Sequence, residues 1–246
     1  MSGIRIFIGN SITSSDFNLI RVKNLSEEYR LREELSRIGR RLYERHLTSG
    51  AGGSVSVRTS KNEILIKPSG FSLADMASEH VVKLNLKGEV LEGKYPPSSD
   101  APWHLMIYER RTDVNAIVHA HPPICGGFAC AGIPLDIPTF TEVIIQIGRI
   151  PFMEYATPTT MDYAKKVAES LKDANALLMK NHGIITLGVN LEQAFQRAEL
   201  LEDFARMILI AKILGEPVLL PEEEVHKLRT LESEKWRMKI IEELYK

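Results

Sequence analysis

A pair of histidines at the end of an apolar run is the feature that most constrains how this chain can fold. Residues 115–118 are mostly apolar, and His119 and His121 follow with one residue between them. Alternate side chains of a β-strand point to the same face, so a strand here would place both imidazoles together. The two rings could supply half the ligands of a metal ion, or they could be hydrogen-bonded structural residues. A third histidine nearby would favour the metal site.

A second apolar run supplies that third histidine. Residues 176–179 lead to His182, and Gly183 then permits a sharp turn of the backbone. Three imidazoles with an open fourth position are typical of a catalytic zinc site. We therefore expect Zn²⁺ or another divalent metal at His119, His121 and His182. The remaining histidines have no partner at ligand spacing and are interpreted as structural: His46, His80, His104 and His226.

The composition restricts the class of protein. The chain has 246 residues, 44% of them hydrophobic, and no linker-like segment, so we expect a single domain over residues 1–246. The formal net charge of −1, with dispersed basic residues, disfavours nucleic acid and anionic membranes as partners. Cys125 and Cys130 lie in an apolar segment and are interpreted as small core residues. With so few cysteines we expect no disulfide, which indicates a reducing compartment. Without a signal sequence or a bilayer-spanning run, the chain is predicted to be cytoplasmic.

Apolar periodicity predicts a mixture of helices and strands. Ser26 is a suitable N-cap for a first helix, and Asp162 is predicted to cap a later one. Residues 1–24 are interpreted as an N-terminal arm, and residues 221–246 as one amphipathic C-terminal helix. Other helices are expected over residues 102–110, 123–131, 143–147 and 191–214, and strands over residues 54–58, 64–67, 81–86, 89–91, 150–155 and 184–187.

Three turns carry hydroxyls and glycines that could bind a phosphate. The first, over residues 48–56, is glycine-rich, so its backbone N–H groups could approach an anion, although it could equally be a flexible lead to a strand. The second is the turn at residues 68–70. The third precedes the helix at residue 102, where the helix dipole adds a positive end. The candidate phosphate ligands are Ser54, Ser69, Gly70, Ser98 and Ser99.

Two carboxylates are candidates for proton transfer. Asp100 stands where an N-cap is common, and it could instead provide a carboxylate to the metal. Glu142 is the only acidic residue beside the apolar run at residues 143–147. Burial there would raise its pKa toward the range useful for acid–base catalysis. At a solvated helix start, its carboxylate would instead only stabilise the positive end of the helix dipole.

Four motifs resemble the class II aldolase/adducin family in order and spacing, across about residues 27–215. They are Ile66-Lys67-Pro68-Ser69-Gly70, Pro97-Ser98-Ser99-Asp100, Val118-His119-Ala120-His121 and Asn181-His182-Gly183. That family includes fuculose-phosphate aldolase, ribulose-5-phosphate 4-epimerase and methylthioribulose-phosphate dehydratase. The resemblance implies an α/β fold, a three-layer α/β/α sandwich with a mainly antiparallel or mixed sheet. It also implies a homotetramer with active sites at subunit interfaces.

The resemblance assigns roles to the candidate residues. The three histidines would bind zinc, with Asp100 either a fourth ligand or the acid/base group beside the metal. Ser69, Gly70, Ser98 and Ser99 fall on phosphate-binding positions. Ser54 replaces an asparagine that touches phosphate or substrate in the family. Glu142 resembles by position the acid/base residue of the epimerase and dehydratase branches, and Tyr245 is the nearest match to a C-terminal tyrosine that reaches an adjacent site.

The expected function is that of a zinc-dependent lyase. It would cleave a small ketose 1-phosphate, similar to L-fuculose 1-phosphate, to dihydroxyacetone phosphate and a short aldehyde. Asp100 is an epimerase-like feature and Pro122-Pro123 an aldolase-like one, so a pentulose-5-phosphate 4-epimerase and a methylthioribulose-1-phosphate dehydratase remain alternatives. An adducin-like structural module is the non-enzymatic alternative. The three histidines argue against it, because a scaffold has no need to gather imidazoles.

Overall fold

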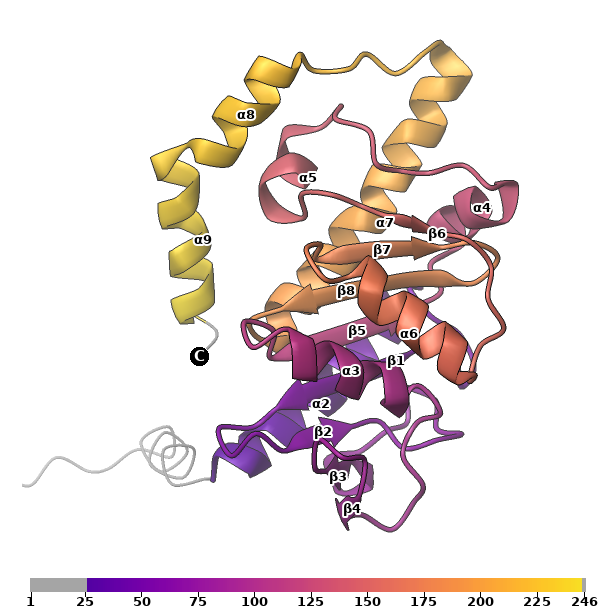
Figure 1. The fold of residues 1–246 in the computed structure, drawn as a ribbon, viewed down its shortest axis with the longest axis vertical. Helices are drawn as coiled ribbons and strands as arrows, with labels where there is room; N and C mark the ends of the chain where they lie inside the picture. Colours follow the sequence, from indigo (N-terminus) through magenta and orange to yellow (C-terminus); the bar gives the residue numbers. More distant parts are fainter. Residues whose placement is uncertain (1–25, 245–246) are drawn as a thin grey trace, which may run out of the picture.

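A central eight-stranded sheet organises the part of the chain that the computed structural model describes, residues 26–244 (Figure 1). The strand order is β4-β3-β2-β1-β5-β8-β7-β6, and every neighbouring pair is antiparallel except the parallel pair β6 and β7. The strands are β1 Ser54–Arg58, β2 Ile64–Ile66, β3 Val82–Leu84, β4 Val90–Glu92, β5 Ala116–Ala120, β6 Phe152–Met153, β7 Ala176–Met179 and β8 Gly183–Gly188. The predicted mixed, mainly antiparallel sheet is confirmed.

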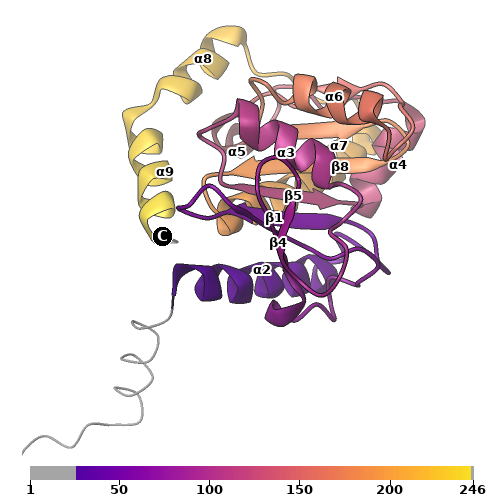
Figure 2. The same ribbon diagram turned by 60° about the horizontal axis from the view of Figure 1, so that its bottom comes forward.

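Helices cover both faces of this sheet. Figure 2 shows α3 and α6 on one side and α2 on the other. The helices are α2 Glu27–Glu44, α3 Ala101–Arg110, α4 Pro123–Ala131, α5 Thr141–Gln146, α6 Met161–Ser170, α7 Leu191–Leu214, α8 Glu222–Thr230 and α9 Glu232–Leu244, with the 3₁₀ turn η1 at Ser78–His80. Alternate strand residues divide the core: Val118 packs with α2, α4 and α7, whereas Ile117 packs with α3 and α6. The three-layer α/β/α architecture is thus confirmed.

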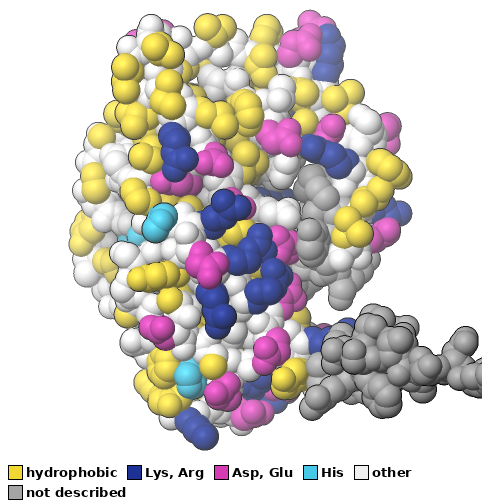
Figure 3. Space-filling view, turned by 180° about the vertical axis from the view of Figure 1, so that it is seen from behind, with side chains coloured by type: hydrophobic (Ala, Val, Ile, Leu, Met, Phe, Trp, Pro, Cys, Tyr) yellow, Lys and Arg dark blue, Asp and Glu magenta, His cyan; other side chains and the backbone are white. Residues whose placement is uncertain are grey.

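Charged side chains of both signs lie on the face opposite α3 and α6 (Figure 3). Ion pairs there join α2 to α7, with Arg41 Nη1 2.6 Å from a carboxylate oxygen of Glu192 and Arg45 Nε 2.8 Å from one of Glu199. No helix within residues 26–244 combines the length and the apolarity needed to cross a membrane.

Several predicted boundaries need correction. Thr160, not Asp162, caps α6, because its hydroxyl accepts from the Tyr163 N–H. The strand predicted over residues 150–155 is only β6. The single C-terminal helix is two helices, since Leu231 between α8 and α9 adopts an extended conformation (φ −59°, ψ 120°). The predicted N-terminal arm and Tyr245 lie outside the described residues.

Candidate metal and substrate site

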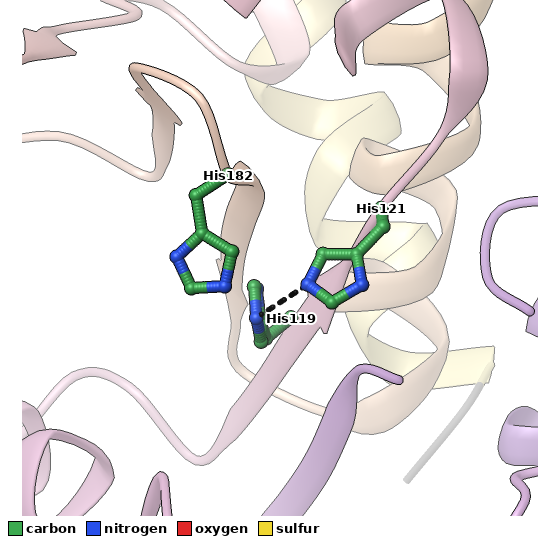
Figure 4. A group of neighbouring side chains, drawn as sticks. All are labelled: His119, His121 and His182. Atoms are coloured by element: carbon green, nitrogen blue, oxygen red, sulfur yellow. Dashed lines mark hydrogen bonds between the residues drawn. The ribbon is translucent and has the colours of Figure 1, made fainter. Parts of the chain in front are cut away.

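The three histidines come from neighbouring strands of the sheet. His119 lies within β5 and His121 just after it. Because side chains alternate along a strand, both rings point toward the sheet face that α3 and α6 cover. His182 lies in the tight turn between β7 and β8, where Asn181 adopts a left-handed conformation (φ 56°). Because β8 pairs with β5, this turn brings His182 beside the other two rings, as Figure 4 shows.

The imidazole nitrogens converge on one point. One possible ligand atom of each ring lies within 4.8 Å of those of the other two, and Nε2 of His121 is 3.1 Å from Nε2 of His119. Nδ1 of His119 is 2.8 Å from the Ile184 carbonyl, which can only accept, so Nδ1 carries a hydrogen and Nε2 is the nitrogen that a metal could bind. Hydrogen-bond partners of this kind orient metal-binding histidines.

His182 is oriented in a similar way. Its Nδ1 lies 2.9 Å from the hydroxyl of Tyr163, and that hydroxyl donates to the sulfur of Met179 at 3.1 Å. With the hydroxyl hydrogen on sulfur, the Tyr163 oxygen can accept from Nδ1–H of His182. In that arrangement Nε2 of His182 also keeps its lone pair.

Burial keeps His121 and His182 in the form that a metal needs. Loss of hydration, followed by the effect of the neighbouring His119 ring, lowers the pKa of His121 to about 3 and that of His182 to about 4. Both rings are neutral near pH 7, and a neutral imidazole is the ligand form. A donor set of three imidazole nitrogens fits a divalent metal such as zinc.

A small cavity opens beside the histidines, with a volume of about 220 Å³. This is below the ~300–1,000 Å³ of sites for drug-sized ligands, and it suits a small substrate. Lys67 lines it, and its ammonium group donates to the carbonyls of Ala51 (2.6 Å) and Gly53 (2.8 Å), which fixes the glycine-rich turn. Burial lowers the pKa of Lys67 to about 8, although Asp100 partly opposes this shift. The remaining lining residues are Gly52, Ser69, Gly70, Ser98, Ser99, Asp100, His119, His121, Pro158, Thr159 and His182.

Two of the predicted phosphate turns are joined by backbone hydrogen bonds. Ser69 N–H donates to Pro96 O at 2.9 Å, and Ser98 N–H donates to Lys67 O at 3.0 Å. Ser69 and Ser99 are exposed at the cavity, whereas Ser98 is buried and its hydroxyl accepts from the Asp100 N–H at 3.3 Å. The structure thus brings both turns to one wall of the cavity at the N-terminus of α3.

Asp100 faces the same cavity with both oxygens held. Ser54 Oγ donates to Oδ2 at 2.8 Å, and Trp103 Nε1 donates to Oδ1 at 3.2 Å. Although it occupies the N-cap position of α3, its side chain makes no capping hydrogen bond. Burial alone would raise the pKa of Asp100, but the neighbouring His119 ring and the hydrogen bonds from Ser54 and Trp103 lower it. Among residues 26–244, the group of converging metal-ligand atoms contains the three histidines without Asp100.

Two predicted site residues lie elsewhere in this chain. Ser54 is fully buried behind Asp100 and does not line the cavity. Glu142 lies in the first turn of α5, where its carboxylate accepts from Gln146 (3.0 Å) and pairs with Arg237 of α9 (3.0 Å). Within one chain, Glu142 therefore does not lie in an apolar cleft beside His119 and His121, as a raised pKa would have required.

Sequence reasoning missed several residues of the site. Tyr163 orients His182, and Thr159 reaches the cavity in a left-handed conformation (φ 65°) that no local pattern indicates. His104, which was interpreted as having no partner, contacts Ser54 and Ser56. The spacing of Asp100 and His104, four residues apart at the start of a predicted helix, is the signal that could have placed their side chains on one face.

The fold and the site define an α/β protein with a three-histidine centre of the kind that binds a divalent metal beside a small-molecule cavity. Residues 33–209 match the family described as "Class II Aldolase and Adducin N-terminal domain", and the chain belongs to this family.

Relatives with lyase names confirm that the chain is an enzyme of this family. A 5-deoxy-D-ribulose 1-phosphate aldolase of Bacillus thuringiensis is 37% identical over 80% of this chain and 92% of its own length. A 3-oxo-tetronate 4-phosphate decarboxylase of Pectobacterium atrosepticum is 30% identical over 76% and 87%. The solved structure of an L-fuculose 1-phosphate aldolase superposes with a TM-score of 0.78 at 34% identity, over 87% of this chain and 98% of that one.

Proposed function

We propose that this protein is a metal-dependent aldolase that cleaves a small ketose 1-phosphate to dihydroxyacetone phosphate and a short aldehyde. The observation that carries the proposal is that three imidazoles and two paired hydroxyl-bearing turns face one cavity. In a small sugar phosphate the carbonyl group and the phosphate lie only a few bonds apart, so a metal site and a phosphate site must share one cavity to bind both. The names of the relatives support the same class of chemistry.

The phosphate is assigned to the wall formed by the two turns. Ser69 and Ser99 would donate hydroxyl hydrogen bonds, and Gly70, with φ +77°, leaves its N–H open to an anion. Ser98 contributes by fixing the turn, since its hydroxyl already accepts from Asp100 N–H. The nearby Lys67 adds positive charge, and the N-terminus of α3 adds the positive end of its dipole.

His119, His121 and His182 would hold the metal. Zinc or another divalent ion bound there would supply Lewis-acid stabilisation of the negative charge that develops on the substrate carbonyl oxygen. Asp100 is the carboxylate of the same cavity, and because its pKa is lowered it is ionised near neutral pH; we assign it the removal of a proton from the carbon that joins the aldehyde in the condensation direction, and the return of that proton in cleavage. Its place outside the group of ligand atoms supports this role over that of a fourth ligand.

Aldol cleavage also requires a base for the hydroxyl of the aldehyde half. Glu142 could serve only from a neighbouring subunit, because in its own chain it lies away from the cavity. We therefore propose a homotetramer in which Glu142 completes the site of an adjacent copy. The mass of the protein in solution tests the assembly.

The proposed function is tested by a product-resolved assay of the purified protein after metal analysis. Dihydroxyacetone phosphate would be offered with a panel of short aldehydes, and ribulose 5-phosphate and 3-oxo-tetronate 4-phosphate would be offered separately. Condensation to a ketose 1-phosphate supports the aldolase. Epimer formation, or release of carbon dioxide without condensation, contradicts it. His182→Ala should abolish the reaction, whereas the exposed His226→Gln serves as a matched control.

Mixed assemblies test the assignment of Glu142. His119→Ala and Glu142→Gln subunits, each inactive alone, would be refolded or co-expressed together. If Glu142 acts across the interface, some sites of the mixed assembly contain both intact residues, and activity returns. Absence of recovery, with mixed assemblies shown to form, would remove Glu142 from the mechanism.

A further inference from the structure

A continuous chain of buried hydrogen bonds lies behind Asp100. It alternates between β1 and α3, because Ser54 and Ser56 share one face of the strand while Asp100, His104 and Tyr108 share one face of the helix. The distances are 2.8 Å from Tyr108 Oη to Ser56 Oγ, 2.7 Å from there to His104 Nδ1, 2.9 Å from His104 Nε2 to Ser54 Oγ, and 2.8 Å to Asp100 Oδ2.

Water has no access to the inner members of this chain. Ser54, Ser56, His104 and Tyr108 have no exposed surface, so their hydrogen bonds must be satisfied by one another. The ring of His104 also stacks on that of Trp103, with centroids 3.9 Å apart. Trp103 in turn donates to the second oxygen of Asp100. Both oxygens of the carboxylate are therefore held by the same short segment of structure.

Counting hydrogens fixes the direction of every bond. Ser54 donates its single hydroxyl hydrogen to Asp100, so in the contact with His104 it can only accept. Nε2 of His104 must then carry the hydrogen, and in a neutral ring Nδ1 is left as an acceptor. Ser56 donates to that Nδ1, and Tyr108 donates to Ser56. All four bonds point toward Asp100.

We propose that His104 is a positioning residue, which holds the Ser54 hydroxyl on Asp100 through its Nε2–H and so fixes the carboxylate that faces the cavity. The inference rests on the proposed function, since Asp100 is the group assigned to proton transfer. Without this donor, Ser54 can turn its hydroxyl elsewhere, and Asp100 keeps only the bond from Trp103. Misplacement of a reacting group by ~1 Å can lower a rate about 10²-fold.

Two substitutions separate positioning from packing. The amide of His104→Gln can place an N–H near the former Nε2, whereas that of His104→Asn reaches only the position of Nδ1. We expect kcat to fall about 10²-fold in the Asn variant, with KM and metal content unchanged, and to stay within a few-fold in the Gln variant. The exposed His226→Gln, which lies outside this chain of bonds, should leave kcat unchanged. Equal kcat values for the Asn and Gln variants would overturn the proposal.

The protonation of the ring gives a test that does not depend on activity. Histidine-¹⁵N NMR of the whole zinc-loaded protein, with the His104 signals identified by their loss in His104→Gln, reports which nitrogen carries hydrogen. The proposal requires hydrogen on Nε2 alone, and hydrogen on Nδ1 alone would refute it. If the parent protein cleaves no ketose 1-phosphate but shows the Nε2–H form, the proposed reaction fails while the hydrogen-bond direction stands.

Discussion

Replacement of His104 by glutamine should make the protein less sensitive to acid. Burial lowers the pKa of His104 from 6.5 to about 3, although Asp100 partly opposes the shift. Between about pH 6.5 and pH 3, the His104 ring therefore binds a proton in the unfolded chain but stays neutral in the native state. Over this window stability falls with decreasing pH, by about 1.4 kcal/mol per pH unit from this one ring. Between pH 7 and pH 5 the loss amounts to about 2 kcal/mol.

Urea unfolding at fixed protein concentration and a series of pH values measures this contribution. A chelator should be present, because metal binding would add its own proton linkage at the three histidine ligands. Those ligands titrate in the parent and in His104→Gln alike, so the difference between the two pH profiles isolates His104. The exposed His226→Gln should follow the parent. Parallel profiles for the parent and His104→Gln would refute the claim that His104 stays neutral in the native state.

Three further predictions concern the cavity and the strand that follows His182. His182→Ala should lose most bound metal, and full occupancy measured by metal analysis would defeat the ligand assignment. Ser99→Ala should raise KM for a phosphorylated substrate about tenfold or more, since a hydrogen bond to a charged oxygen contributes roughly 1.5–3 kcal/mol; an unchanged KM would place the phosphate elsewhere. Gly183→Ala should lower stability by roughly 1–3 kcal/mol because its Cβ would lie 2.4 Å from Ala120 O, whereas Gly126→Ala, with open space, should not.

Short-range periodicity was enough to predict much of the fold and the gathering of the histidines. The spacing of His119 and His121 placed both rings on one strand face without knowledge of the neighbouring strands. The bounds of α7 agree with the prediction, because Asn190 caps its start and Gly215 follows its end. These features depend on residues within a few positions of each other, and local sequence contains them.

The contacts that escaped prediction join residues far apart in the sequence. Glu142 meets Arg237 across 95 positions, and Ser54 meets Asp100 across 46. No periodicity within either segment indicates which element lies opposite. The pairing of β1 with α3 had to be seen before Ser54 could be recognised as a partner of the carboxylate, in place of the phosphate ligand that the resemblance implied.

The position of Ser54 explains how one small change of side chain can alter the role of a residue. Its strand pairs directly with His119, so its side chain points toward the site yet stops behind Asp100. The Ser54 hydroxyl has one hydrogen, and it donates this hydrogen to the Asp100 carboxylate in a hydrogen bond. His104 then supplies the donor that the Ser54 oxygen needs, and a buried pair becomes a directed chain. The orientation of the proposed acid/base group thus depends on core residues that no substrate touches.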